Sequence, residues 1–117
     1  MIMEESILIT IRQMIGPSAS YDVFDLDLII NINAAFSRLC QLGVGPLTPF
    51  KIKDENAKWA DFWNGMDGEM PDEVKQYIYL KTRMIFDTPA SGTVANAFKE
   101  QIDMLEWTLK EVARFGY

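Results

Sequence analysis

The stretch of sequence that decides the fold is VKQYIYLKTRMIFDTPASGTVANAFKEQIDMLEW, which runs from Val74 to Trp107. The segment from Asp87 to Gly92 carries the proline, serine and glycine of a turn, and it separates two parts with helical spacing. In the second part and beyond it, apolar residues every three or four positions fall on one stripe: Val94, Phe98, Ile102, Leu105, Leu109 and Val112. This spacing predicts a helix with one buried face, so the chain should end in a long helical hairpin.

The first helix of this hairpin is apolar on several sides. Tyr79 and Phe86 share one side, and Leu80 lies on another. The remaining apolar residues share a third side: Val74, Tyr77, Ile78, Met84 and Ile85. A helix of this kind needs neighbours on several sides. Either it is central in its own domain, or part of its surface contacts another chain.

Upstream of the hairpin, the pattern predicts three shorter helices, which we expect at Met3 to Met14, Asp25 to Leu42 and Ala57 to Asn64. The first should end at Gly16, since glycine is favoured just after the last helical turn. Asp22 or Asp25 is the expected N-cap of the second helix. Pro71 suits the first position of the hairpin's first helix, where its missing N–H has no partner to lose.

The segment between the second and third helices is expected to be an extended loop over residues 43–56. Its first part, Gly43 to Ile52, has two glycines and two prolines and cannot continue a helix. At most one short strand is expected, near Phe50 to Lys53. The predicted fold class is therefore all-α, with about five helices, the long C-terminal hairpin and this one loop. No linker divides the chain, so residues 1–117 are predicted to form a single domain.

Composition narrows the function by exclusion. With 49% hydrophobic residues the chain is typical of a globular protein, and no segment approaches the roughly 20 apolar residues of a membrane span. We therefore expect no membrane partner. The first residues lack the basic start and cleavage site of a secretory signal, which favours a protein made and kept in a cytoplasm. Cys40, the single cysteine, lies on the apolar side of its predicted helix and is expected in the core.

Charge argues against a DNA-binding protein. The 17 acidic and 11 basic residues give a net charge of −6, and the basic residues are scattered. A surface that grips duplex DNA must neutralise about one phosphate charge per ~1.7 Å with lysine and arginine. The sequence is compatible with close approach to DNA without binding. It contains no histidine, so the usual general base and the commonest metal ligand are missing.

No arrangement of residues predicts catalysis, a cofactor or a metal. The densest acidic cluster is Asp67, Glu69, Asp72 and Glu73. Aligned as a calcium loop with Gly68 at the invariant glycine, it has Trp63, Gly65 and Val74 where acids belong, so it is better explained as a solvated helix N-terminus. Ser91 and Thr93 are expected as turn and cap residues. We therefore predict that the chain is not an enzyme and needs no cofactor.

Several apolar residues fall on surfaces where polar ones are usual. Trp107 lies on the charged side of the last helix, and it is either covered by another part of the fold or kept for a partner. Leu26 and Ile30 fall opposite the buried stripe of their helix. On the last helix, Glu106 and Lys110 have the spacing of an (i, i+4) ion pair. Exposed apolar residues of this kind together would describe a subunit of an assembly.

Three stretches of the chain resemble one family, the small head–tail connector or adaptor proteins of long-tailed bacteriophages and prophages. The first is ININAAFSRLCQLGVGP from Ile30 to Pro46, and the second is Trp59-Ala60-Asp61-Phe62. The third and most specific is VKQYIYLKTRMIFDTPASGTVANAFKEQIDMLEWTL, from Val74 to Leu109. They cover well over half the chain, in the family's order and spacing. The last predicted helix lies close to Tyr117, so we expect any C-terminal extension used elsewhere in the family for portal contact to be short or missing.

The resemblance implies a structural virion protein that associates with itself in a closed ring, usually a dodecamer, docked under the portal protein. The ring would continue the DNA channel, let DNA pass without sequence-specific binding, and meet the next head-completion or tail protein. Its place would be the head–tail interface of the virion, after assembly in the host bacterial cytoplasm. Whether free subunits are monomers stays open. As hypothetical subunit or portal contacts we name Leu26, Ile30, Val44, Leu47, Phe50, Tyr79, Phe86 and Trp107.

One alternative from another class is a monomeric helical regulator or inhibitor, encoded by a prophage, that binds a host protein through the same exposed aromatic residues. Self-association separates the two hypotheses. A connector must carry a patch that is complementary to a different patch on its own copy, and a regulator need not.

Overall fold

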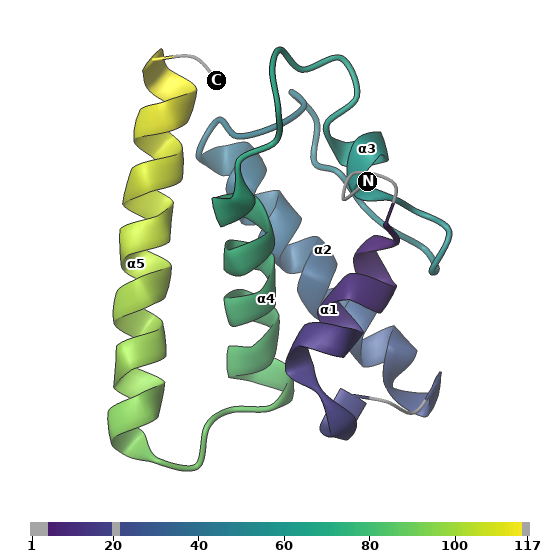
Figure 1. Ribbon diagram of the computed structural model, residues 1–117, viewed down its shortest axis with the longest axis vertical. Helices are drawn as coiled ribbons and strands as arrows, with labels where there is room; N and C mark the ends of the chain where they lie inside the picture. The colour runs from purple at the N-terminus through teal and green to yellow at the C-terminus, as the bar shows by residue number, and fades with distance from the viewer. Residues whose placement is uncertain (1–4, 20–21, 116–117) are drawn as a thin grey trace.

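The computed structural model describes residues 5–19 and 22–115, which fold as an all-helical chain (Figure 1). The α-helices are α1 (Ile7–Ile15), α2 (Asp25–Gln41), α3 (Trp59–Phe62), α4 (Asp72–Phe86) and α5 (Gly92–Phe115), with short 3₁₀ turns at η2 (Pro17–Ala19) and η3 (Asp22–Phe24). Within the described ranges there is no strand; the residues expected as a short strand near Phe50 have no regular secondary structure, and an isolated bridge joins Ser6 to Lys58. The all-α prediction and the C-terminal hairpin are confirmed.

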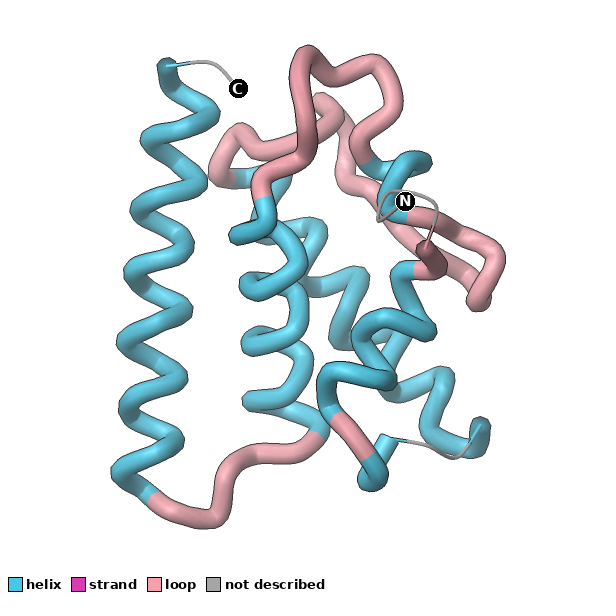
Figure 2. Tube along the Cα trace, in the orientation of Figure 1, coloured by secondary structure: helices cyan, strands magenta, loops and turns pink. Residues whose placement is uncertain are grey.

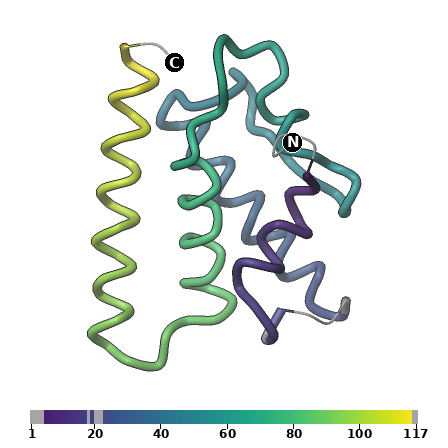
Figure 3. Tube along the Cα trace, in the orientation of Figure 1, coloured from purple at the N-terminus to yellow at the C-terminus, as the bar shows by residue number. Residues whose placement is uncertain are grey.

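Helix α4 is the centre of the molecule. It contacts α1 and α2 on one side and α5 on another, and Figure 1 shows it between them. This arrangement explains why the helix is apolar on several sides: Tyr77 and Ile78 are fully buried, and Leu80 is buried as well. Helix α5 lies at one edge of the molecule, antiparallel to α4 (Figure 3). Of the two explanations offered for α4, the central position is the one that the structure supports.

The helix ends follow the expected chemistry, with several shifts. Ser6 accepts a hydrogen bond from the Ile9 N–H at 3.2 Å and caps α1, so this helix begins at Ile7; the expected start at Met3 lies outside the described residues. Gly16 closes α1 with φ of 100°, as predicted. Neither Asp22 nor Asp25 is the N-cap of α2. That position is Phe24, and Asp25 in the first turn pairs with Arg12 instead.

The N-terminal end of α4 differs by one residue, because Pro71 is the cap and the helix begins at Asp72. After α4, the turn from Asp87 to Ser91 connects the two helices of the hairpin, as predicted. Ser91 caps α5, since its carbonyl accepts from the Ala95 N–H at 2.9 Å and its hydroxyl from the Val94 N–H at 3.4 Å. None of the described helices combines the length and apolar character that crossing a membrane requires.

The loop after α2 is held on the core by one asparagine. Asn33 accepts from the Ile52 N–H at 2.7 Å and donates to the Ile52 carbonyl at 3.0 Å, which replaces the pairing that a neighbouring strand would supply. Ile52 and Val44 are both buried, so the loop is anchored at two points. Figure 2 shows the loops between α2 and α4 gathered at one end of the molecule and the α4–α5 turn at the other.

An aromatic cluster fixes α3 and the loop to α2. The ring of Phe36 on α2 lies 5.2 Å from Phe50, 4.7 Å from Phe62 and 6.2 Å from Trp59, measured between centroids. The Trp59 indole also donates to Thr10 on α1 at 3.2 Å. The short helix predicted around Trp59 and Phe62 therefore exists, and it pins the loop to the core as expected. It is only one turn long, whereas the prediction ran from residue 57 to 64.

Two expectations about the core are wrong. Cys40 is half-buried near the loop rather than in the core, with its Sγ 3.5 Å from the Leu47 carbonyl. Ile85 shares one side of α4 with the buried Tyr77 and Ile78 on the helical wheel, but in the last turn of the helix this side is exposed. On α5 the predicted stripe is buried at Ile102, Leu105 and Leu109, whereas Val94 at its start is exposed.

Candidate interaction surface

The residues proposed as contacts divide into three groups by exposure. Four are open to solvent, with exposed fractions of 67% for Leu26, 57% for Ile30, 99% for Leu47 and 63% for Trp107. Three others, Phe50, Tyr79 and Phe86, are half-buried. Val44 is fully buried. Four large apolar side chains of the proposed set are therefore left uncovered by the part of the chain that the structure describes.

Val44 belongs to the core and not to the surface. The chain turns back on itself after α2, and the Val44 N–H donates to the Leu39 carbonyl at 2.9 Å. Gly43 and Gly45, both with positive φ, make this reversal possible and direct the valine side chain inward. We therefore remove Val44 from the candidate contacts.

The half-buried members have partners within the chain. Phe50 packs between Phe36 and Phe62, so its main role is to anchor the loop. The Tyr79 hydroxyl accepts a hydrogen bond from Arg83 at 2.7 Å. That arginine also lies over the ring of Phe98 on α5. Phe50 and Tyr79 are thus weaker candidates for a contact with another molecule than the four exposed residues.

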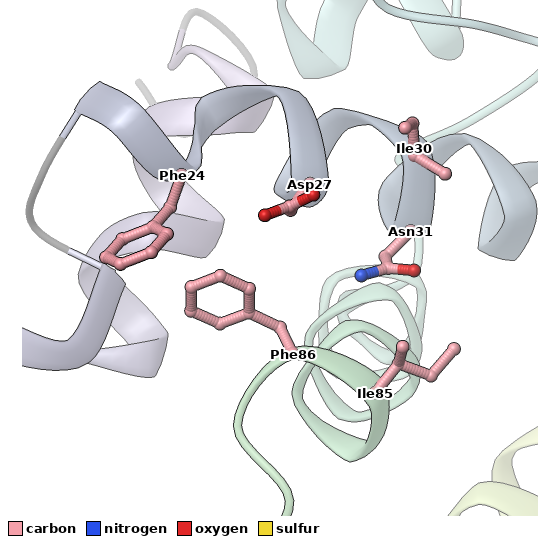
Figure 4. A pocket seen from close by; sticks show the side chains of 6 residues that line it. All are labelled: Phe24, Asp27, Ile30, Asn31, Ile85 and Phe86. Atoms are coloured by element: carbon pink, nitrogen blue, oxygen red, sulfur yellow. The ribbon is translucent and has the colours of Figure 1, made fainter.

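An open groove runs between the first half of α2 and the C-terminal end of α4. It has a volume of about 540 Å³ and is lined by Phe24, Asp27, Ile30, Asn31, Ile85 and Phe86, which we call the α2–α4 groove (Figure 4). Phe24 and Phe86 form its end wall in an edge-to-face pair with centroids 5.5 Å apart. The groove brings together Ile30 and Phe86 of the proposed set, and Leu26 lies one turn from Ile30.

Sequence reasoning missed four of the residues that line this groove. Asp27 is a favourable charge near a helix N-terminus and was not among the named contacts, and Ile85 was only grouped with other apolar residues on one side of its helix. Phe24 and Asn31 carried no signal by themselves. The useful signal would have been the spacing of Asp27 and Asn31, which are four residues apart and therefore share a face of α2 with the apolar groove.

A second exposed surface lies on α5, which contributes no residue to the α2–α4 groove. Trp107 and Met104, three residues apart, are both exposed and form an apolar ridge that we call the α5 ridge. Trp59 and Trp63 are buried and each donates an indole hydrogen bond, to Thr10 and to the Gly68 carbonyl. Trp107 has no such partner among the described residues. Of the two explanations left open for Trp107, coverage by the described part of its own fold is excluded.

A cluster of three polar residues attaches α5 to the rest of the molecule. The Glu106 carboxylate accepts from the Tyr77 hydroxyl on α4 at 2.6 Å and from the Arg38 guanidinium on α2 at 3.0 Å. Partial burial by itself raises the pKa of Glu106, but the hydrogen bonds from Arg38 and Tyr77 outweigh it and the pKa lies below its ordinary value. Burial and the same carboxylate raise the pKa of Tyr77. The predicted ion pair of Glu106 with Lys110 is wrong, because the Glu106 carboxylate binds Arg38 of α2 and Tyr77 of α4 instead.

The described residues contain no group of three or more His, Cys, Asp or Glu side chains that could hold a metal ion. What the described residues offer is a helical body with apolar side chains exposed on α2, α5 and the tip of one loop. Exposed apolar residues of this kind are typical of surfaces that contact other proteins.

The family follows from comparison with known proteins. The sequence model of the phage connector protein family matches residues 7–114, nearly the whole chain, and the protein belongs to that family. Connectors are structural virion proteins of the head–tail junction, where they contact other virion proteins, and they are not known as enzymes. Neither the curated proteins nor the solved structures contain a significant match to this chain.

Proposed function

We propose that the protein is a ring-forming head–tail connector that docks under the portal, continues the DNA channel and bridges the capsid to the next head-completion or tail protein. The observation that carries this proposal is the match to the connector family over residues 7–114. The exposed apolar residues support it, because a monomer in solution gains nothing from exposing Trp107, Leu26 and Ile30. Subunits would be made in the host cytoplasm and assemble there onto filled heads.

Such a ring needs contacts between its subunits and contacts with the proteins above and below it. Neighbouring subunits must meet through two different, complementary patches, and the α2–α4 groove and the α5 ridge are candidates for these patches on separate elements. Leu47, the fully exposed tip of an otherwise anchored loop, is available for the portal or for the next protein. The net charge of −6 suits a channel wall that DNA passes without being held.

Sedimentation velocity over a range of protein concentrations, with the protein alone and with portal-bearing capsids, tests this function. A ring-sized species in either condition is the expected result. Leu47→Asp should leave the fold and the ring unchanged and weaken the attachment to portals, because a charge at this position cannot enter an apolar contact. A protein that stays monomeric and ignores portals would contradict the proposal and favour the alternative of a regulator.

A further inference from the structure

We propose that the α5 ridge of one subunit inserts into the α2–α4 groove of the next, so that the occupant of the groove is a second copy of this chain. The inference rests on the proposed ring and specifies which residues join neighbouring subunits. The two surfaces share no residue and no element, since the groove is built by α2, α4 and the turn before α2, and the ridge by α5. Every copy can therefore offer its ridge in one direction and its groove in another.

The apolar parts of the two surfaces match in character. The groove offers the exposed side chains of Ile30 and Ile85 and the half-buried rings of Phe24 and Phe86. The ridge offers one large flat ring, Trp107, and one adaptable chain, Met104, three residues apart on a rigid helix. An open groove of about 540 Å³ has room for both side chains.

Polar groups supply the second and independent match. Asp27 and Asn31 point into the groove in Figure 4, and neither has a hydrogen-bond partner among the residues that the structure describes. Two acceptors beside apolar walls suit an aromatic ring that carries a donor. Trp107 is such a group, because its indole N–H is exposed and has no partner among the described residues.

Charge also sets the direction in which α5 would lie. Among the described residues that line the groove, Asp27 is the only charged one. On this side of α5, Glu100 and Asp103 precede Trp107, whereas Lys110, Glu111 and Arg114 follow it, so the C-terminal half is the more basic one. The favourable orientation therefore places the C-terminal half of α5 next to Asp27 of the neighbouring subunit. In this orientation Asp103 lies away from Asp27, so the two carboxylates do not repel each other.

Cysteine cross-linking tests the pairing directly. In a Cys40→Ser background, Ile30→Cys places a thiol in the groove and Met104→Cys places one on the ridge. Under mild oxidation the two single variants, when mixed, should form a heterodimer and nothing larger. A chain that carries both substitutions should form a covalent ladder that stops at the size of the ring.

The matched control is Lys99→Cys, another exposed position on α5, which lies about 140° around the helix from Met104. If wild-type protein assembles but Ile30→Cys joins Lys99→Cys as readily as Met104→Cys, the proposed pairing is wrong while the ring function stands. Cross-linking of Ile30→Cys to the portal instead of to its own copy would overturn the pairing as well. If wild-type protein forms no ring alone or on portals, the ring function fails and the pairing fails with it.

Charge reversal provides a readout of the polar match. Asp27→Lys should weaken self-association by about tenfold or more, and Lys110→Glu should do the same. Both positions are exposed, so neither change should prevent folding, although Asp27→Lys removes a favourable charge from the first turn of α2. The double variant should recover most of the wild-type association. If the two effects simply add, Asp27 and Lys110 do not meet in the assembly and the stated direction of α5 is wrong.

Discussion

At the scale of single residues, Gly45 shows how closely the loop is fitted to the core. Its φ is 90°, and a Cβ atom at this position would lie 2.5 Å from Cζ of Phe62. Gly65 has a similar φ of 82° with nothing within 4 Å of the corresponding Cβ position. Alanine substitutions at these two glycines therefore distinguish the cost of backbone strain from the cost of steric overlap with Phe62.

We predict that Gly65→Ala lowers the free energy of unfolding by about 1 to 2 kcal/mol, the cost of a left-handed conformation. Gly45→Ala should lose about 1 to 3 kcal/mol more, because Phe62 belongs to the packed aromatic cluster and cannot move without disturbing it. Urea unfolding of both variants measures the difference. Equal losses would mean that the cluster yields to the added methyl group.

Trp107 allows a second prediction at this scale. Trp107→Ala should change the free energy of unfolding by no more than about 0.5 kcal/mol, since the side chain is exposed and has no hydrogen-bond partner among the described residues. Trp59→Ala leaves a cavity in the core and removes a hydrogen bond to Thr10, so it should lower the free energy of unfolding by about 3 to 5 kcal/mol. Urea unfolding compares the two variants. A large loss for Trp107→Ala would place it in a stabilising contact and contradict its assignment to an assembly surface.

At the scale of elements, α5 is attached to the rest of the fold by one stripe of apolar residues and one polar cluster. The cluster predicts a dependence on pH. Burial alone would raise the pKa of Glu106, but the hydrogen bonds from Arg38 and Tyr77 lower it below the value in the unfolded chain. The stability that this carboxylate contributes is therefore fully present above the ordinary glutamate pKa of about 4.3 and is lost as the pH falls through the folded pKa.

We predict that Glu106→Gln lowers the free energy of unfolding at neutral pH by about 1 kcal/mol, the usual net value of such hydrogen bonds. The difference from wild type should shrink at acidic pH, where the wild-type carboxyl is protonated too. Denaturant unfolding at several pH values measures it. Glu100→Gln on the same helix is the control, because Glu100 is exposed and should show neither effect. A pH-independent difference would mean that the charge of Glu106 is not what the cluster uses.

The elements also show what the sequence could and could not reveal. Helices α2, α4 and α5 were predictable because apolar spacing is a local property, and Gly16, Gly43 and Ser91 mark ends by their own backbone chemistry. The N-cap of α2 could not be predicted, because Asp25 forms an ion pair with Arg12, which lies on α1. Long-range partners of this kind leave no trace in local spacing.

The candidate surface was predictable to a smaller extent. The helical spacing identified Leu26, Ile30 and Trp107 as apolar residues outside the buried stripe of their helices, and all three are exposed. It could not identify Val44 as buried, because a reversal through two positive-φ glycines decides where that side chain lies. Nor could it show that Ile85, in the last turn of α4, is exposed and lines the groove.

At the scale of the whole molecule, the absence of a separating linker within residues 5–19 and 22–115 predicts one cooperative unfolding unit. Circular dichroism reports all helices, including the 24 residues of α5, whereas tryptophan fluorescence reports mainly the buried Trp59 and Trp63. The two unfolding curves should coincide. A first step seen only by circular dichroism would mean that α5 detaches before the rest and that the single-domain prediction is wrong.

The net charge of −6 belongs to the same scale and concerns DNA. A protein that lines a channel for DNA must not bind it, and a surface without a basic patch repels the phosphate backbone. We predict no retardation of duplex DNA by the protein in a gel assay, even at a low salt concentration of about 50 mM. The control replaces four exposed acidic residues, Glu55, Asp67, Glu69 and Glu100, by lysine, which changes the net charge from −6 to +2. This variant should retard DNA at low salt and release it as salt increases, because its binding depends on the displacement of counterions. Retardation by the wild-type protein would contradict the proposed channel, because a wall that holds DNA would oppose its passage.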